Sequence, residues 1–240
     1  MSENINLQAG DSHRLSAYLA RPTGPAIAGL VVVQEAFGVN AHIRRVTDGY
    51  ARDGFLAIAP ALFDRIERGV ELGYEGTDRD RGIALARQID PGDALKDVAA
   101  ALQYLREQKM KKCGVIGYCM GGSIAWLAAT RLDPDTAVGY YGGYIARFGH
   151  ENPRCPVMLH FGTLDKHIPK SDIDQVQKLH PHVQIFWYEA EHGFNCDDRA
   201  SYNPEAAGLA RERSLEFLRK NLISGSCLVG ERMSEGRTKH

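Results

Sequence analysis

Short apolar runs alternate along the chain with longer stretches in which apolar residues recur at helical spacing. The short runs are rich in β-branched residues, and several are apolar throughout, as is typical of central parallel strands covered on both faces. Strands are predicted at 15–20, 26–34, 55–59, 114–117, 137–141, 157–161 and 184–188. Helices are predicted at 41–53, 82–88, 93–108, 122–131, 170–179 and 204–222. This alternation predicts an α/β fold with βαβ units, a mostly parallel sheet and helices on both of its faces.

Two segments fall outside this pattern. The segment 64–77 is charged, contains glycines and shows no period, so we expect a loop near the rim of the functional site. The periodicity also ends after residue 222. Because no internal repeat or linker is visible, we expect a single domain over 1–222, followed by a flexible tail at 223–240.

Composition and charge narrow the class of protein. A chain of 240 residues, 44% apolar and 25% charged, suits one soluble globular enzyme domain. A formal net charge of −1 without long charged blocks gives no reason to expect nucleic acid or a membrane surface as partner. No apolar run approaches the ~20 residues that span a bilayer, and no secretory signal is visible. The five scattered cysteines show neither a disulfide framework nor C-x-x-C spacing, which favours a reducing, cytoplasmic setting.

The most informative motif surrounds Cys119. An apolar strand leads into Gly117-Tyr-Cys-Met-Gly121, and an apolar helical segment follows at once. This is the nucleophile-elbow pattern Gly-x-Nuc-x-Gly, with a thiol as the nucleophile. Glycines are needed on both sides because the chain passes too close for side chains, and the following helix directs its positive end at the sulfur. The alternative is a tight turn with a buried cysteine, but the flanking strand, helix and glycines favour the nucleophile.

A thiol nucleophile needs a base and a group that orients the base. Asp165 follows the strand predicted at 157–161, and His192 follows the strand predicted at 184–188. Working residues of open α/β sheets lie at the carboxyl ends of strands, so both are well placed. The order nucleophile, acid, histidine is that of α/β-hydrolase triads. We therefore expect His192 to transfer the proton and Asp165 to fix its tautomer.

The other histidines have simpler interpretations. His160 lies in an apolar strand and is expected to be a hydrogen-bonded core residue, whereas His167 competes for Asp165. A surface position is expected for His13, His42, His150, His180 and His182. Asp197 and Asp198 are expected to form a solvated turn. No grouping has the sequence spacing of a metal site, so no metal is expected.

A second loop completes the predicted site. The strand 26–34 ends at Glu35, on the loop that supplies an oxyanion donor in α/β hydrolases. The oxyanion hole is therefore assigned to the backbone N–H groups of Ala36 and Met120. Glu35 would then lie near the sulfur, where a carboxylate would favour the protonated thiol or accept its proton. A plain surface glutamate at a strand end is the alternative.

Four motifs together resemble one family. They are Gln34-Glu-Ala-Phe-Gly-Val-Asn40, Gly114-Val-Ile-Gly-Tyr-Cys-Met-Gly-Gly122, Gly162-Thr-Leu-Asp-Lys-His-Ile-Pro169 and Glu191-His-Gly-Phe194. Over roughly 15–222 the chain resembles the dienelactone hydrolase family of the α/β-hydrolase fold. The resemblance implies opening of an activated lactone or ester, of the dienelactone-to-maleylacetate type, through a Cys-His-Asp triad and an acyl-enzyme. It implies no cofactor and no large lid. It also implies that Glu35 keeps the resting thiol neutral and takes its proton when substrate moves it.

The resemblance is weaker at the substrate end. Relatives that act on dienelactone bind its carboxylate with arginines, one of them in a His-x-Phe-x-Arg pattern. Here Cys196 occupies that arginine's position, and Arg199 follows three residues later. Arg79 or Arg81 would supply the second guanidinium, with Arg79 preferred. Tyr141 is a further candidate for the pocket, although a core aromatic is the simpler interpretation.

Several alternatives remain open at this point. One is a general carboxylesterase or thioesterase on the same fold. Another is the group of cysteine-elbow stress proteins and amidotransferases, against which the late Asp165 and His192 argue. A third is a non-enzymatic redox sensor that uses Cys119 as an oxidisable thiol. The expected partner is a small, anionic ester or lactone, and the expected assembly is a monomer or a small homo-oligomer.

Overall fold

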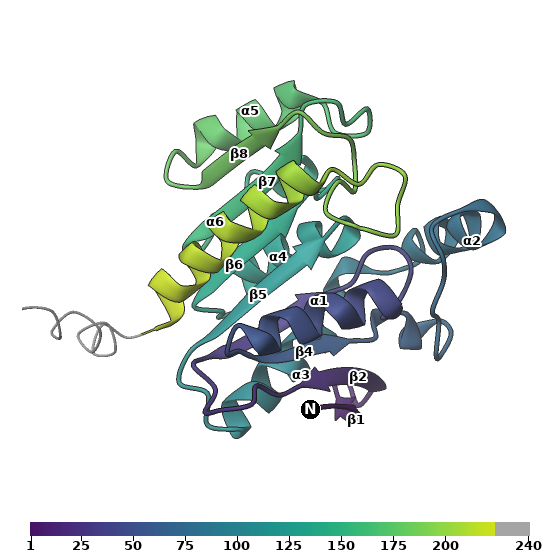
Figure 1. Cartoon of the computed structure of the whole chain (residues 1–240), viewed down its shortest axis with the longest axis vertical. Coiled ribbons are helices and arrows are strands. Elements are labelled where there is room, and N and C mark those ends of the chain that lie inside the picture. The colour runs from purple at the N-terminus through teal and green to yellow at the C-terminus, as the bar shows by residue number, and fades with distance from the viewer. Residues whose placement is uncertain (224–240) are drawn as a thin grey trace, which may run out of the picture.

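The computed structural model describes residues 1–223, and the tail predicted from 223 onward lies outside this range except for its first residue. An eight-stranded sheet forms the centre of the molecule (Figure 1). Its strands along the chain are β1 (Ser2–Gln8), β2 (Arg14–Ala20), β3 (Gly29–Val33), β4 (Leu56–Pro60), β5 (Cys113–Tyr118), β6 (Thr136–Tyr140), β7 (Val157–Gly162) and β8 (Gln184–Tyr188).

The strands follow the order β1-β2-β4-β3-β5-β6-β7-β8. The six strands from β4 to β8 run parallel, while β1 and β2 add an antiparallel edge. Every residue of β3 to β7 is buried, which explains their nearly continuous apolar sequences. The seven predicted strands are confirmed, although β3 begins at Gly29 rather than at residue 26.

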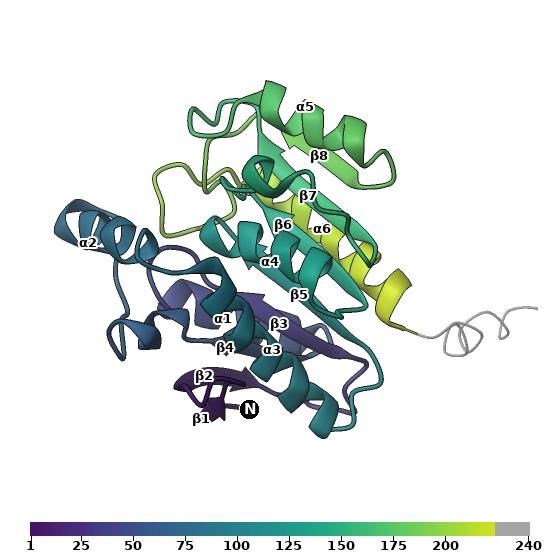
Figure 2. The ribbon, with the colours of Figure 1, turned by 180° about the vertical axis from the view of Figure 1, so that it is seen from behind.

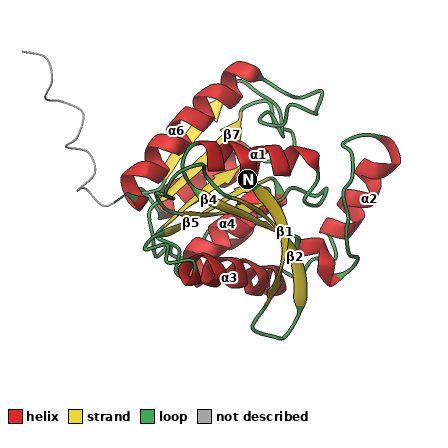
Figure 3. Cartoon of the chain, turned by 60° about the horizontal axis from the view of Figure 1, so that its bottom comes forward, coloured by secondary structure: helices red, strands yellow, loops and turns green. Residues whose placement is uncertain are grey.

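Six α-helices accompany the sheet within residues 1–223. They are α1 (Ala41–Arg52), α2 (Gly76–Ala86), α3 (Pro91–Glu107), α4 (Met120–Arg131), α5 (Lys170–Leu179) and α6 (Pro204–Leu222). Helices α1 and α6 cover one face of the sheet, and α3 and α4 cover the other (Figures 1 and 2). Figure 3 shows the sheet between α1 and α3. The predicted layering of helices on both faces is thereby confirmed.

Helix α2 differs most from the prediction. It begins at Gly76, before the predicted start at 82, and a short 3₁₀ helix at Leu62–Arg65 overlaps the first two residues of the segment predicted as a loop. Only Gly82 and Leu85 of α2 are buried, so its sequence lacks the apolar period that would predict a helix. At Gly82 a Cβ would overlap the carbonyl oxygen of Ala36, so α2 packs directly on the loop after β3. No helix in residues 1–223 is long and apolar enough to cross a membrane.

Two histidines are buried in the structure, although only one of them was predicted to lie in the core. His160, on β7, is fully buried, and its ring nitrogens lie 2.8 Å from the Tyr188 hydroxyl and 3.0 Å from the Ser214 hydroxyl. The predicted core role of His160 is confirmed. The surface position predicted for His180 is wrong, because this side chain is buried and its Nε2 lies 2.7 Å from the Gly149 carbonyl oxygen.

Burial of His160 makes folding stability depend on pH. Burial, aided by Arg213, lowers the pKa of His160 from 6.5 to about 3. The neutral ring therefore contributes stability above pH 6.5, and this stability is lost as the pH falls towards 3, because the unfolded chain binds the proton first. At pH 4.5 the loss from this residue should be about 2.7 kcal/mol.

Urea unfolding at pH 7.5 and pH 4.5 measures this loss. The free energy of unfolding of His160→Gln should fall about 2–3 kcal/mol less between the two pH values than that of the wild type. The exposed His150→Gln variant should follow the wild type. An equal fall in His160→Gln and wild type would contradict the role assigned to His160.

Candidate active site

The structure places Cys119 at a sharp turn between β5 and α4. Its backbone adopts φ 53° and ψ −116°, a conformation in which a non-glycine residue is strained. A Cβ on Gly117 would overlap the Gly121 carbonyl, and a Cβ on Gly121 would overlap that of Val33. The two glycines therefore allow the turn, which lifts the thiol to the carboxyl end of the sheet, at the N-terminus of α4.

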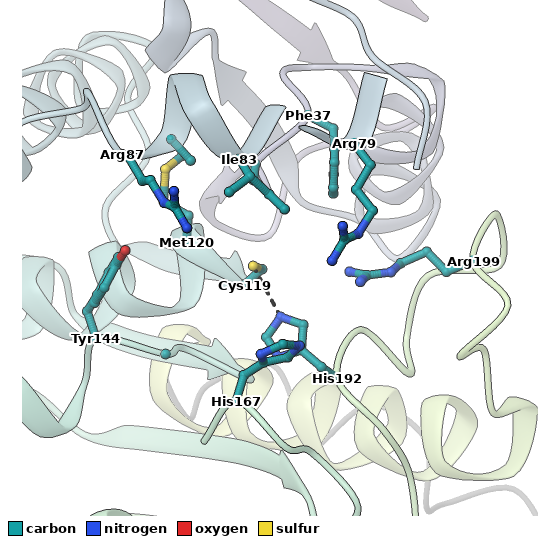
Figure 4. Close-up of a pocket in the computed structure, with 13 residues that line it drawn as sticks. Phe37, Arg79, Ile83, Arg87, Cys119, Met120, Tyr144, His167, His192 and Arg199 are labelled. Carbon is teal, nitrogen blue, oxygen red and sulfur yellow. Dashed lines mark hydrogen bonds between the residues drawn. The ribbon is translucent and has the colours of Figure 1, made fainter. Parts of the chain in front are cut away.

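Three side chains from separate loops form a continuous hydrogen-bonded chain. His192 Nε2 lies 3.2 Å from Cys119 Sγ (Figure 4). The Nδ1 of His192 lies 2.7 Å from Asp165 Oδ2. The other carboxylate oxygen of Asp165 accepts the backbone N–H of His167 at 2.8 Å. Asp165 is therefore held by two partners and orients the imidazole towards the sulfur. The three residues predicted from their positions after strands meet at one point.

The electrostatics of the trio favour a charged histidine. Burial opposes the charge on His192, but the neighbouring Cys119 thiolate and Asp165 raise its pKa to about 10. For Asp165, burial is outweighed by the hydrogen bond from His192, and the pKa of the carboxyl is lowered. Asp165 therefore favours the protonated form of His192, as expected of the group that orients a catalytic base.

A cavity of about 300 Å³ opens beside the sulfur. Helix α2 contributes Arg79 and Ile83 to its wall. The remaining lining residues are Ala36, Phe37, Ala86, Arg87, Cys119, Met120, Gly143, Tyr144, His167, His192 and Arg199. Figure 4 shows Arg79 and Arg199 pointing towards one another on one side of Cys119, with Arg87 on the other. The cavity therefore combines an apolar wall with cationic groups.

The oxyanion hole was predicted to consist of the backbone N–H groups of Ala36 and Met120. Both residues line the cavity beside Cys119. Met120 is the first residue of α4, so its N–H has no partner within the helix. The loop that carries Ala36 is fixed by α2, which packs on its carbonyl at Gly82.

Glu35 is not a surface residue. Its side chain is fully buried, so the alternative of a solvated glutamate is wrong. Neither carboxylate oxygen has a hydrogen-bond partner among residues 1–223, and no hydrogen bond joins it to Cys119. The nearest cation is Arg199, whose Nη1 lies 3.7 Å from Oε1. Although burial disfavours the charge on Arg199, the Glu35 carboxylate raises its pKa.

The structure separates the remaining substrate-binding candidates. Arg79 and Arg199 line the cavity, whereas Arg81 forms an ion pair with Glu67 and does not line it. Tyr141 is fully buried, with φ 38°, and its ring centroid lies 5.1 Å from that of His192. Its position matches the interpretation as a core aromatic that packs against the catalytic imidazole.

Sequence reasoning missed a polar cluster next to Glu35. His42 was expected at the surface, but it is buried, and its Nδ1 lies 2.9 Å from Asp197 Oδ1. Cys196 is also buried, and burial together with the Glu35 carboxylate raises its pKa to about 12, so it is no second nucleophile. Asp197 is exposed, as expected for a turn, but pairs with Arg45 as well. The only signal for His42 was its place just after the Glu35 loop.

Comparison with known proteins agrees with the fold and the motifs. The model of the dienelactone hydrolase family matches residues 15–222. The chain is 34% identical over 238 residues to a putative carboxymethylenebutenolidase of Synechocystis, covering 91% of this chain and 94% of that protein. It is 32% identical over 227 residues to a carboxymethylenebutenolidase of Pseudomonas putida, covering 91% and 96%.

A solved structure is also similar. A putative dienelactone hydrolase from Klebsiella pneumoniae superposes with a TM-score of 0.80 at 25% identity, covering 92% of this chain and 99% of that one. The fold, the family match and the full-length relatives agree. The chain is a hydrolase with the α/β-hydrolase fold and belongs to the dienelactone hydrolase family.

Proposed function

We propose that this hydrolase opens an activated lactone or ester, of the dienelactone-to-maleylacetate type, with Cys119 as nucleophile. The observation that carries the proposal is the chain from Asp165 through His192 to Cys119, with distances of 2.7 and 3.2 Å, at the wall of the cavity. A cavity of about 300 Å³ suits a small substrate.

The reaction proceeds in two steps. The Cys119 sulfur attacks the carbonyl carbon while His192 holds the thiol proton, and the N–H groups of Ala36 and Met120 stabilise the oxyanion. Collapse breaks the carbon–oxygen bond of the ester, and His192 returns the proton to the leaving oxygen. In a lactone the leaving oxygen stays attached to the acyl group. Water, deprotonated by His192, then cleaves the thioester and regenerates the thiol.

The cationic side of the cavity favours an anionic substrate. Arg79 and Arg199 point towards one another beside Cys119 (Figure 4). The family pattern has an arginine at the position of Cys196. Arg199, three residues further along the chain, reaches the site instead. Guanidinium groups bind carboxylates through paired hydrogen bonds. We therefore assign recognition of a substrate carboxylate to Arg79 and Arg199.

Two arginines on the same helix provide a matched test of this assignment. Arg79→Gln should lower kcat/KM for an anionic lactone by about 10- to 100-fold, the effect of losing a hydrogen bond to a charged group. The loss for a neutral p-nitrophenyl ester should be much smaller. Arg81→Gln is the control, because Arg81 pairs with Glu67 and does not line the cavity. Equal losses for both substrates in Arg79→Gln would contradict carboxylate recognition.

Glu35 is proposed as a second acceptor for the thiol proton. Its carboxylate is buried, has no hydrogen bond within residues 1–223 and is neutralised in part by Arg199. Arg199, whose Nη1 lies 3.7 Å from Glu35 Oε1, also lines the cavity with Cys119, which supports an electrostatic influence of Glu35 on the thiol. A buried carboxylate there opposes the thiolate in the resting enzyme and accepts the proton when substrate displaces the thiol.

Replacing Glu35 with glutamine should move two rates in opposite directions. Turnover should fall by about 100-fold, since a proton acceptor is lost. Alkylation of Cys119 by iodoacetamide should become faster, since a negative charge that opposes the thiolate is removed. Stopped-flow alkylation and steady-state kinetics measure the two rates. An unchanged turnover in Glu35→Gln would exclude the proposed role.

The experiment that tests the function compares substrates. Steady-state hydrolysis is measured with the cis and trans dienelactones and with a neutral p-nitrophenyl ester. Preference for a dienelactone supports the proposal. Activity on the neutral ester alone would favour a general carboxylesterase or thioesterase. Rapid oxidation of Cys119 by peroxide without any turnover would favour a redox sensor.

A further inference from the structure

Three buried side chains with metal-ligating atoms converge beside the active site. They are Glu35 after β3, His42 in the first turn of α1 and Cys196 in the loop before α6. Their ligand atoms, a carboxylate oxygen, a ring nitrogen and the sulfur, all lie within 4.8 Å of one another. Each side chain is at most 3% exposed. The group, called here the Glu35–His42–Cys196 cluster, is distinct from the Cys119 triad.

The cluster contains polar atoms without partners. Both oxygens of Glu35 and Nε2 of His42 have no hydrogen bond within residues 1–223, and the same holds for the hydroxyl of Tyr74. The ring of Tyr74 lies 6.2 Å from that of His42. A buried polar atom without a partner costs about 1–3 kcal/mol, so several of them at one place indicate a missing polar ligand.

The orientation of His42 fits metal ligation. Its Nδ1 lies 2.9 Å from Asp197 Oδ1, so the carboxylate fixes Nδ1 as the protonated nitrogen. The lone pair of Nε2 then remains free, and Nε2 is buried without a hydrogen-bond partner within residues 1–223. A histidine whose other nitrogen donates to a carboxylate is the usual arrangement of histidine ligands in metal sites.

We propose that Glu35, His42 and Cys196 bind a divalent transition-metal ion of the Zn²⁺ class. Carboxylate, imidazole and thiolate are the ligands that Zn²⁺ uses in proteins, whereas Mg²⁺ and Ca²⁺ prefer oxygen alone. A water molecule completes a four-coordinate site. The expectation of no metal rested on sequence spacing, and the fold brings together residues that are far apart in the chain.

Two anionic ligands offset the charge of the ion. On binding, Cys196 releases its proton to solvent, and the thiolate and the Glu35 carboxylate carry two negative charges, beside the Arg199 guanidinium 3.7 Å from Glu35 Oε1. His42 keeps its hydrogen bond to Asp197. A bound ion would occupy the Glu35 carboxylate, which could then not accept the proton of the Cys119 thiol. This consequence alone rests on the proposed function.

Cobalt(II) reports on thiolate ligation directly. The test uses the full chain with Cys119→Ala, which removes the catalytic thiol as a ligand, and Cys227→Ser, because Cys227 lies outside the described residues. After treatment with chelator, Co²⁺ is titrated and the sulfur-to-cobalt charge-transfer band is recorded. We expect one equivalent to bind with this band, and Zn²⁺ to displace it. Absence of the band at stoichiometric Co²⁺ would overturn the proposal, and the cluster would then hold water.

Variants in the same background identify the ligands. Cys196→Ser should abolish the band, and His42→Ala should abolish it or weaken binding by more than 100-fold. Asp197→Asn should weaken Co²⁺ binding by about 10- to 100-fold, the usual effect of losing the carboxylate that orients a histidine ligand. Cys155→Ser, a half-buried cysteine outside the cluster, should bind as the parent does. A band that persists in Cys196→Ser would overturn the assignment. Because no readout depends on turnover, failure here is distinguishable from failure of the proposed esterase activity.

Discussion

Replacement of Cys119 by alanine is expected to reduce kcat/KM for the best lactone or ester by about 10⁶-fold, as removal of a triad nucleophile does elsewhere. The reason is structural. The Cys119 sulfur lies 3.2 Å from His192, and no other cysteine of residues 1–223 lines the cavity. The cavity and the oxyanion donors remain, so a residual acceleration of about 10³-fold over water should survive.

The loss of kcat/KM in Cys119→Ala is to be measured together with the mass of the acyl-enzyme. Wild-type protein quenched in acid during turnover should carry the mass of one acyl group on the peptide containing Cys119. Cys119→Ala should bind substrate but carry no adduct. Cys155→Ala is the matched control, since this half-buried cysteine does not line the cavity, and it should keep wild-type turnover. Turnover of Cys119→Ala within tenfold of the wild type would remove the cysteine mechanism.

The fold was predictable where burial dictates the sequence. Strands β3 to β7 are buried on both faces, so their sequences are apolar runs that can be recognised without any other information. Strand β1 was not predicted, because its Ser, Glu and Asn residues are mostly exposed and its conformation comes from antiparallel pairing with β2. Helix α2 was misplaced for a related reason: few of its side chains are buried.

The site was predictable as far as topology determines it. Cys119, Asp165 and His192 each follow a parallel strand, and carboxyl ends of parallel strands meet at one edge of the sheet. The same rule cannot distinguish Arg79 from Arg81, since that choice depends on which face of α2 meets the cavity. Topology also did not reveal the burial of His42. This residue lies in the first turn of α1, and its partner Asp197 lies in a loop that is far away in the sequence.

Asp165→Asn is expected to reduce turnover by about 10⁴-fold, the effect of the corresponding change in other triads. Asp165 accepts two hydrogen bonds, from the backbone of His167 and from His192 Nδ1. An asparagine can keep the first bond with its oxygen, but its NH₂ group then faces His192. The imidazole must accept at Nδ1 and carry its proton on Nε2, where it cannot take the proton of the Cys119 thiol.

A double-mutant cycle separates this explanation from a general loss of structure. If Asp165 acts only by orienting His192, the loss in Asp165→Asn/His192→Ala should equal the loss in His192→Ala alone, instead of the product of the two single losses. Asp174→Asn serves as the control, because Asp174 is an exposed residue that pairs with Lys170 on α5, and it should leave turnover unchanged. Multiplicative losses would mean that Asp165 stabilises the site independently of His192. The hydrogen-bonded chain would then describe packing, and the proton pathway to Cys119 would have to be assigned to another group.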